Sequence, residues 1–216
     1  MLKKKRNVFI TGGAKRIGAA ISEALADIGC NIIIHYNKSE KAANGLRNKI
    51  NKRFEKAFCV KANLSNQKEV EKAFKTAKKK FGYIDCLVNN ASVFEYDSLK
   101  SVNSSSWNKH MSANLDAPLT LSKLFFKNLP SKKSGDIINI LDQRVLNLTP
   151  HFLSYTISKS ALWTMTKTLA LELAPKIKVN AIGPGPVIKS KFQTDLEFKN
   201  QCKRMPLQIG SQPHEI

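Results

Sequence analysis

Short apolar runs alternate with longer amphipathic stretches along the whole chain. Apolar runs of about four to eight residues predict strands, whereas apolar positions that recur every three or four residues predict helices. The predicted strands span residues 7–11, 30–36, 56–62, 84–89, 136–141 and 177–182. The predicted helices fill the intervals, at residues 16–28, 39–54, 66–81, 104–128 and 152–174.

The alternation predicts the fold class. Successive strands separated by helices require right-handed crossovers, which place helices on both faces of a parallel sheet. The predicted strands are almost wholly apolar, as expected of strands that are covered on both sides. We therefore expect an α/β fold with a Rossmann-like, doubly wound parallel sheet. All residues, 1–216, are expected to form one domain.

The net charge of +20 is the unusual feature of the composition. Such a charge could indicate a nucleic-acid partner, but the lysines are spread over several predicted helices without a recognition module. We therefore expect no nucleic-acid partner. The sequence contains no apolar run of membrane-spanning length and no signal-peptide core, so we expect no membrane partner and a cytoplasmic protein. The scattered cysteines and histidines lack ligand spacing, which predicts no metal site.

A glycine-rich turn joins the first predicted strand to the first helix. Glycines let the backbone approach a pyrophosphate, and the helix N-terminus adds N–H donors and partial positive charge. Strand, glycine turn and helix in this order are typical of a dinucleotide site. The turn supplies the predicted cofactor-binding residues Thr11, Gly12, Lys15, Arg16, Ile17 and Gly18.

The end of the second predicted strand indicates which dinucleotide is bound. An acidic residue there would bind a ribose 2′-hydroxyl and repel a 2′-phosphate, but this chain has none. Hydrogen-bond donors and positive charge surround the position instead, which favours NADP(H) over NAD(H). In the alternative interpretation, Arg16 and Lys38 are only solvated. The predicted cofactor-binding residues of this segment are His35, Tyr36, Asn37, Lys38 and Ser39.

Tyr155 and Lys159 stand four residues apart in the last predicted helix, and Asp142 precedes Tyr155 by thirteen residues. Side chains at positions i and i+4 lie on one helix face, so the Lys159 ammonium is expected to lower the pKa of Tyr155. A phenol near pH 7 needs such help, because its ordinary pKa is about 10. The pair alone is common on helix surfaces, but with the nucleotide turn it predicts a proton relay.

Five segments in order resemble the short-chain dehydrogenase/reductase family over essentially the whole chain. The resemblance implies that Tyr155 donates a proton, that Lys159 holds the nicotinamide ribose and that Asn114 fixes a water linked to Lys159. It also implies further cofactor contacts from Asn63, Leu64, Asn90, Ala91, Pro184 and Gly185. Asn63 departs from the family, which usually has an aspartate there. The matching segments are Thr11-Gly12 to Gly18, Asn89-Asn90-Ala91, Asn114, Tyr155 with Lys159, and Pro184-Gly185.

Asp142 stands where most of the family has a serine, and this substitution resembles the pteridine reductase branch. The Ala-Lys-Arg turn, the His-Tyr-x-x-Ser segment and Asn-Asn-Ala-Ser-x-Phe at 89–94 match the same branch. The resemblance implies reduction of a pterin or dihydrofolate-type C=N bond, because a carboxyl group beside Tyr155 suits protonation of nitrogen. In the alternative, Asp142 caps a loop or pairs with Arg144. The implied substrate contacts are Arg16, Ser92, Phe94, Asp142 and Tyr155.

Two rival functions remain open at this point. A general carbonyl or 3-oxoacyl thioester reductase, acting on a ketone, would use the same tyrosine and lysine. A non-enzymatic NADP(H)-binding scaffold or sensor would keep the glycine turn, but it would not need Asn114, Asp142, Tyr155 and Lys159.

The C-terminal part departs from the family. The family usually continues with one more helix and a final strand bearing Asp-Gly-Gly, whereas this sequence ends at Pro213-His214-Glu215-Ile216. We therefore expect a sheet that lacks this edge strand, and a homo-oligomer only if the full C-terminal part is present. Residues 186–216 mix Phe192, Phe198 and Leu207 with polar residues, and we expect them to cover the substrate site.

Overall fold

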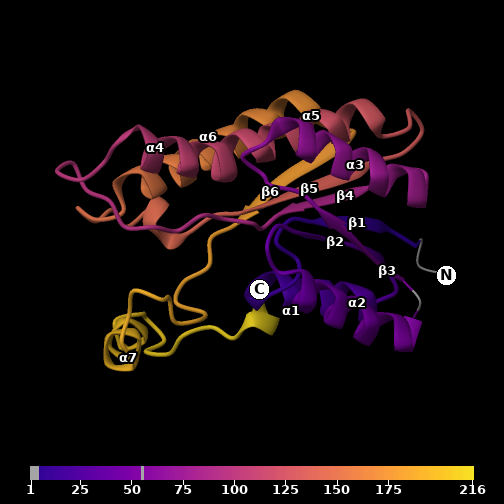
Figure 1. Cartoon of the computed structure of the whole chain (residues 1–216). Helices are drawn as coiled ribbons and strands as arrows, with labels where there is room; N and C mark the ends of the chain where they lie inside the picture. The colour runs from indigo at the N-terminus through magenta and orange to yellow at the C-terminus, as the bar shows by residue number, and fades with distance from the viewer. Residues whose placement is uncertain (1–4, 55) are drawn as a thin grey trace.

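Six parallel strands form one sheet in the computed structural model, which describes residues 5–54 and 56–216. The strand order is β3-β2-β1-β4-β5-β6 (Figure 1). The order reverses between β1 and β4, as in doubly wound sheets. The predicted fold class is thus confirmed. The strands are β1 (Asn7–Ile10), β2 (Asn31–Tyr36), β3 (Ala57–Lys61), β4 (Cys86–Asn89), β5 (Gly135–Ile140) and β6 (Ile177–Ile182).

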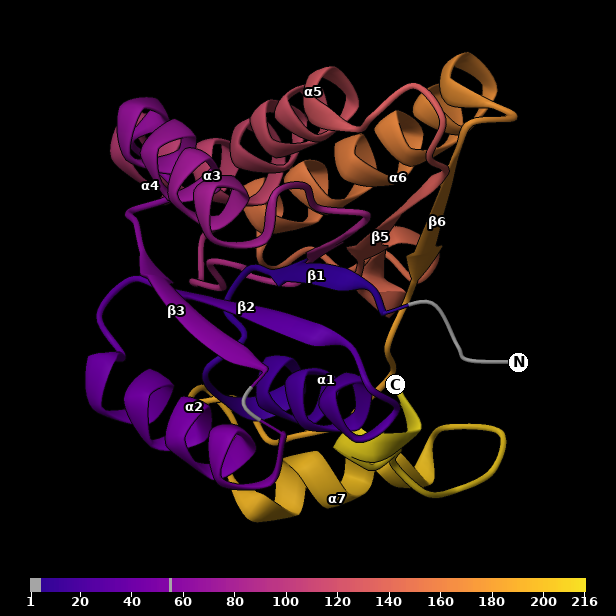
Figure 2. The same cartoon turned by 90° about the vertical axis from the view of Figure 1, so that its right-hand side faces the viewer.

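Helices cover both faces of the sheet. Figures 1 and 2 show α1 (Arg16–Asp27) and α2 (Glu40–Phe54) on one face, together with α7 (Asp195–Lys203). On the other face lie α3 (Gln67–Phe81), α4 (Ser104–Met111), α5 (Ala117–Asn128) and α6 (Leu153–Leu173). No helix of the described residues is both long and apolar enough to cross a membrane.

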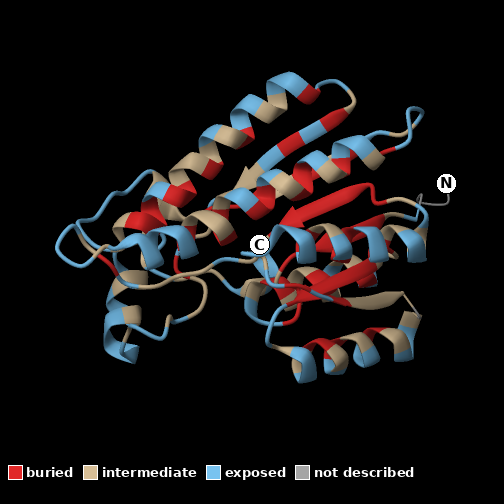
Figure 3. Cartoon of the chain, turned by 45° about the horizontal axis from the view of Figure 1, so that its top comes forward, coloured by how far each residue is buried: buried red, intermediate tan, exposed pale blue. Residues whose placement is uncertain are grey.

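Neighbouring residues of each central strand pack into two different cores. Phe9 of β1 belongs to the core under α3 and α5, whereas Val8 and Ile10 belong to the core under α1 and α2. Successive side chains of a strand point to opposite faces, so an all-apolar strand fits only between two helical layers. Figure 3 shows the consequence, with buried residues concentrated in the sheet and on the inward faces of the helices.

Two segments differ from the sequence prediction. The single helix expected over 104–128 is divided by a π-helical turn, Ser112–Asp116, between α4 and α5. Such a turn inserts extra backbone and is frequent at functional sites. The segment after residue 186 contains α7, whose N-terminus is fixed by a capping box between Thr194 and Glu197. Local capping thus gives a helix where the apolar pattern is weak.

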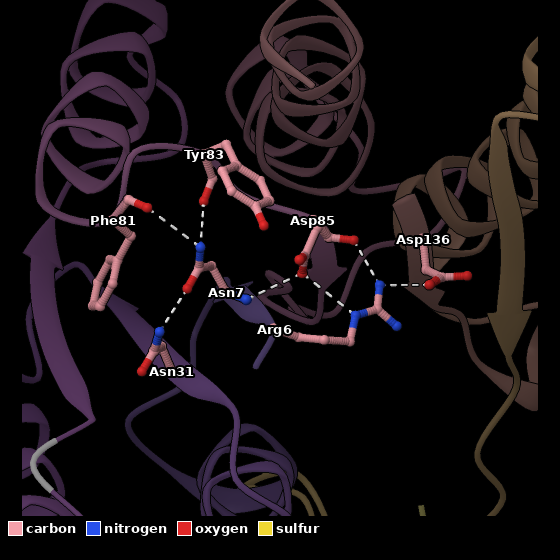
Figure 4. A network of polar contacts seen from close by, with 7 residues as sticks. All are labelled: Arg6, Asn7, Asn31, Phe81, Tyr83, Asp85 and Asp136. Carbon is pink, nitrogen blue, oxygen red and sulfur yellow. Dashed lines mark hydrogen bonds and ion pairs between the residues drawn. The ribbon is translucent and has the colours of Figure 1, made fainter. Parts of the chain in front are cut away.

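A polar network joins the starts of β1, β4 and β5 at the amino-terminal edge of the sheet (Figure 4). The Asn7 backbone N–H donates to Asp85 Oδ1 at 3.1 Å, and Asn7 Nδ2 donates to the Tyr83 carbonyl at 2.8 Å. The Arg6 guanidinium donates to the Asp85 carbonyl at 2.6 Å and lies 2.5 Å from Asp136 Oδ2. The network fixes the order of these strands at the edge opposite the predicted site.

Candidate active site

A cleft of about 910 Å³ opens at the carboxyl-terminal edge of the sheet, next to the point where the strand order reverses. Ligands of doubly wound sheets bind at this position, because the loops after the strands diverge there. Four chain segments and α7 contribute to its wall. They are the glycine turn, residues 90–94, residues 140–144 with 151–159, and residues 184–193.

Two positions of the glycine turn can hold only glycine. Gly12 has a left-handed φ of +61°, and a Cβ on Gly18 would lie 2.2 Å from the Gly12 carbonyl oxygen. Asn90 closes the turn from the other side, since its Nδ2 donates to the Thr11 carbonyl at 2.9 Å. The backbone before α1 is therefore held open to the cleft, which fits a diphosphate group at a helix N-terminus.

Thr11 and His35 support the glycine turn and are not among the residues that line the cleft, so their direct contact with a cofactor remains a prediction. Thr11 Oγ1 accepts the N–H groups of Asn90 and Ala91, each at 2.9 Å. His35 Nδ1 accepts the Gly12 N–H at 3.1 Å, while its Nε2 lies 3.0 Å from the Ala62 carbonyl. Burial lowers the pKa of His35 to about 4, so the ring is neutral and Nδ1 remains an acceptor.

The other predicted cofactor residues divide into two groups. Gly12, Lys15, Arg16, Ile17, Gly18, Asn90, Ala91, Pro184 and Gly185 line the cleft. Tyr36, Asn37, Lys38, Ser39, Asn63 and Leu64 lie at the ends of β2 and β3, outside its lining. In this second group the side chains of Asn37, Lys38 and Asn63 are exposed, so the 2′-phosphate contacts remain a prediction.

Arg16 connects the glycine turn to the covering segment, residues 186–216, which the sequence predicts to cover the substrate site. Its φ of +54° lies in the left-handed region, and its Nη2 donates to the carbonyls of Ile188 and Lys189 at 3.0 and 3.1 Å. Arg16 lines the cleft, as predicted for a substrate contact, but its guanidinium binds the backbone of residues 188–189 in this structure. The glycine turn is therefore joined directly to the segment after β6.

Tyr155 and Asp142 meet directly. The Tyr155 hydroxyl donates to Asp142 Oδ2 at 2.8 Å, and Asp142 Oδ1 accepts the Arg144 backbone N–H at 2.9 Å. One carboxylate oxygen therefore caps the short helix Gln143–Val145, while the other faces the phenol. Asp142 therefore caps the loop and binds Tyr155 at the same time, because the two contacts use different carboxylate oxygens.

The protonation of Tyr155 differs from the expectation. Burial, and after it the charge of Asp142, raise the pKa of Tyr155 well above its ordinary value of 10. Lys159 does not overcome these effects, because its Nζ lies 6.0 Å from the Tyr155 ring centroid and donates to the Ile140 carbonyl at 2.8 Å. Complete burial lowers the pKa of Lys159 to about 8, against the opposing effect of Asp142. The site thus keeps Tyr155 neutral, with its proton available for donation.

Asn114 lies in the π-helical turn, behind the wall of the cleft. Its Oδ1 accepts the Val93 N–H at 2.8 Å, and its Nδ2 donates to the Val93 carbonyl and to Ser158 Oγ, both at 3.0 Å. The Ser92 hydroxyl also donates to Oδ1 at 3.2 Å. Asn114 therefore joins the loop after β4 to α6, and the turn's extra backbone lets its side chain reach both.

Stacked aromatic rings form one wall beside Tyr155. Phe94 and Phe152 stack with centroids 4.4 Å apart and planes 10° apart, and Phe192 of the covering segment meets both edge-on. The Arg144 guanidinium lies 4.8 Å from the Phe152 ring centroid. Phe94 is among the residues predicted from the sequence, whereas Phe152 is a site residue that the sequence motifs did not indicate. Its position three residues before Tyr155 was the available signal, because this places it at the start of the same helix.

Comparison with known proteins gives a consistent assignment. The family model of short chain dehydrogenases matches residues 6–200. A 3-oxoacyl-[acyl-carrier-protein] reductase of Synechocystis sp. is 32% identical over 209 residues, which are 96% of this chain and 84% of that protein.

Solved structures show the same similarity. The FolM alternative dihydrofolate reductase 1 of Brucella canis, complexed with NADP, has a TM-score of 0.93 and 41% identity, covering 97% of this chain and 83% of that one. A blue fluorescent protein from a metagenomic library, in complex with NADPH, has a TM-score of 0.90 and 27% identity, covering 97% of this chain and 86% of that one.

Proposed function

Because the chain belongs to the short-chain dehydrogenase family, an oxidoreductase family, we propose that it is an NADPH-dependent reductase of a pterin or dihydrofolate-type C=N bond. The observation that carries the proposal is the hydrogen bond from Tyr155 to Asp142 beside the aromatic wall. The 41% identity to a dihydrofolate reductase complexed with NADP supports the same assignment.

The glycine turn and the charges around it suit a phosphorylated dinucleotide. Gly12 and Gly18 keep the backbone open at the α1 N-terminus, and Lys15 adds positive charge at the cleft. The exposed Asn37 and Lys38 follow β2 where an acid would select against a 2′-phosphate. When bound, NADPH supplies a hydride to the substrate carbon. These residues bind and orient it, while Pro184 and Gly185 border the cleft beyond β6.

Tyr155 is the proposed proton donor to the substrate nitrogen. Its hydroxyl keeps its proton until transfer, because burial and the Asp142 carboxylate oppose the phenolate. The Lys159 ammonium, 6.0 Å from the phenol ring, counters the charge that develops on Tyr155 during donation. Asp142 can also accept an N–H or amino hydrogen of a pterin ring. This arrangement suits nitrogen protonation, since a carboxylate repels the oxygen of a ketone as negative charge grows.

The aromatic wall suits a flat ring. Phe94 and Phe152 stack on each other, so only an outer face of the pair can receive a planar heterocycle, and such stacking is favourable. Ser92 and Arg16 lie on the same cleft and remain proposed substrate contacts. The alternative function is a carbonyl or 3-oxoacyl thioester reductase, which the 32% identity to the Synechocystis enzyme favours. Both functions use the same cofactor and tyrosine, so the substrate separates them.

A substrate panel tests the proposal. NADPH oxidation is followed by the fall in its absorbance.

 The wild-type protein is assayed with dihydrobiopterin, dihydrofolate and an acetoacetyl thioester, and each assay is repeated with Asp142→Ser. We expect the wild type to prefer a pterin or folate, and the substitution to lower that turnover by about tenfold or more while raising the relative rate on the thioester.

The matched control is Asp136→Ser, which removes a carboxylate from the other end of the same chain segment, at the start of β5. It should leave the order of substrate preference unchanged. Wild-type turnover of the thioester alone would replace the pterin assignment with the carbonyl one. Full pterin turnover by Asp142→Ser would remove Asp142 from the mechanism.

A further inference from the structure

Behind Tyr155 lies a buried polar cluster that the proposed chemistry does not use. It consists of Asp97 from the loop after β4, His110 from α4, and Ser154 from the first turn of α6. Asp97 is 1% exposed, and His110 and Ser154 are 0% exposed. Burying three polar side chains together is costly unless each is hydrogen-bonded, so the partners of each group indicate what the cluster does.

Asp97 caps the helix that carries Tyr155. Phe152 stands at the N-cap position of α6 and has no side-chain group to bind the free N–H donors. Asp97 replaces that cap from a distant part of the chain. Its carbonyl accepts the Leu153 N–H at 3.2 Å, its Oδ1 accepts the Ser154 N–H at 3.0 Å, and its Oδ2 accepts the Ser154 hydroxyl. A carboxylate at this end also complements the helix dipole.

His110 links the same serine to the loop after β4. Its Nε2 faces the Glu95 backbone N–H at 3.2 Å, and because that group can only donate, Nε2 accepts and the ring proton is on Nδ1. Nδ1 lies 2.6 Å from Ser154 Oγ and 3.0 Å from the Ser106 carbonyl. Burial lowers the pKa of His110, which preserves this neutral form.

His110 and Asn114 act together on one extended segment. They stand four residues apart, and they accept the N–H groups of Glu95 and Val93, which are two residues apart. Alternate residues of an extended chain present their N–H groups in one direction. The two side chains accept these N–H groups as the carbonyls of a neighbouring strand would. Phe94, between the two anchored residues, lines the cleft.

The helix side of the cluster holds Tyr155 from both directions along the chain. Ser154, immediately before it, binds Asp97 and His110. Ser158, three residues after it, donates to the Tyr155 carbonyl at 2.7 Å and accepts from Asn114 Nδ2. The His110 ring also packs edge-on to the Tyr155 ring, with centroids 6.1 Å apart.

We propose that Asp97, His110 and Ser154 are positioning residues, which hold the first turn of α6 against residues 93–97 and so keep Tyr155 and Phe94 in register across the cleft. The inference rests on the proposed role of Tyr155 as proton donor. None of the three lines the cleft, so they act through Tyr155 and Phe94 and not by contact with the substrate.

Paired substitutions of His110 test the inference. His110→Leu removes all hydrogen bonds of the ring, whereas His110→Gln keeps an oxygen that can accept the Glu95 N–H and an amide that can donate to Ser154. We expect His110→Leu to lower kcat by about 30-fold, since small displacements of a catalytic group cost up to about 10²-fold. The Kd of NADPH should change by less than about threefold, because the glycine turn is untouched. His110→Gln should recover most of kcat.

Two further variants separate positioning from loss of stability. Ser154→Ala is the milder change, because the Ser154 backbone N–H still reaches Asp97, and it decides the matter if His110→Leu does not fold. We expect it to lower kcat by about fivefold. Asn7→Ala is the matched control at the opposite sheet edge, where it removes buried side-chain hydrogen bonds to Tyr83 and Asn31. It should lower Tm and leave the kcat of the folded protein unchanged.

The outcomes distinguish this inference from the proposed function. If folded His110→Leu and Ser154→Ala keep the wild-type kcat while Tyr155→Phe loses it, the positioning role is wrong and the function stands. If Tyr155→Phe also keeps the wild-type kcat, the proposed function itself fails. A fall in kcat with unchanged NADPH affinity, recovered by His110→Gln, supports the positioning role.

Discussion

The amino-terminal and carboxyl-terminal edges of the sheet carry similar charged and polar groups, but these groups have different roles. At the amino-terminal edge, Asp85 accepts hydrogen bonds from Asn7 and Arg6, and all three are held by the strands that they join (Figure 4). At the carboxyl-terminal edge, Asp142 accepts a hydrogen bond from the Tyr155 hydroxyl, and both face the cleft. A carboxylate thus stabilises the fold where its hydrogen-bond donors are fixed groups. Where its donor is itself a titratable acid, the carboxylate can change the pKa of that acid.

The difference follows from what surrounds each carboxylate. Asp85 is bound by a guanidinium and a backbone N–H, neither of which loses a proton at ordinary pH. Asp142 shares one hydrogen bond with a phenol whose pKa is raised by burial and, after it, by this carboxylate. The hydrogen-bond ladders of parallel strands end at both edges of the sheet. The crossover loops diverge only at the carboxyl-terminal edge, so open space is available there.

Tyr155→Phe should give the largest effect, because it removes the titratable hydroxyl that binds Asp142 at the carboxyl-terminal edge. Loss of the proposed proton donor should lower kcat by about 10² to 10⁴, the range typical of a general acid. The Kd of NADPH, measured by fluorescence titration, should be nearly unchanged, and so should Tm. A variant with wild-type turnover would mean that the carboxyl-terminal edge carries no acid chemistry at Tyr155.

Asp85→Ala tests the other edge. The substitution leaves the Asn7 N–H and the partly exposed Arg6 guanidinium without their carboxylate, so we expect the free energy of unfolding to fall by about 3 kcal/mol. Denaturant titration measures the loss, and kcat at a temperature where the variant is folded should equal that of the wild type. Asp136→Asn, which changes a more exposed partner of Arg6, should cost about 1 kcal/mol or less. Reduced kcat of folded Asp85→Ala would contradict the division between the edges.

His35 lies near the cleft, and yet its role is structural, because it binds the Gly12 N–H of the glycine turn. Its pKa is lowered to about 4 in the folded protein, against 6.5 without the fold, so the unfolded chain binds the extra proton between these values. Stability should therefore fall as the pH decreases through this window, by about 2 kcal/mol from pH 7 to pH 5. Urea titrations at both pH values measure it. His35→Gln should abolish this contribution, whereas His214→Gln, at an exposed site, should retain it.

Asn37→Asp should give the smallest effect. A carboxylate after β2 would repel a 2′-phosphate and accept a 2′-hydroxyl, so the ratio of kcat/KM for NADPH over NADH should fall by about tenfold. Steady-state assays with both cofactors measure the ratio. Asn48→Asp on α2 is a control for added negative charge. An unchanged ratio would place the selection of the cofactor elsewhere, with Lys15 and Arg16 as the next residues to substitute.

The amino-acid sequence was sufficient to predict the sheet, the glycine turn and the family. Each of these depends on patterns within one segment: apolar runs form buried strands, Gly12 and Gly18 fit where side chains cannot, and Tyr155 and Lys159 share a helix face. The order of such segments was enough to predict the doubly wound fold, because crossover handedness leaves few alternatives.

The protonation of Tyr155 and the hydrogen bonds that support the site became evident from the three-dimensional fold alone. Burial and Asp142 set the pKa of Tyr155, whereas the sequence suggested Lys159 as the dominant neighbour. His35 proved to be a support for the glycine turn, and Asp97 caps a helix 57 residues away. A pKa and a remote hydrogen bond depend on solvent exclusion and on distances between segments, and neither quantity is encoded in the spacing of residues along one segment.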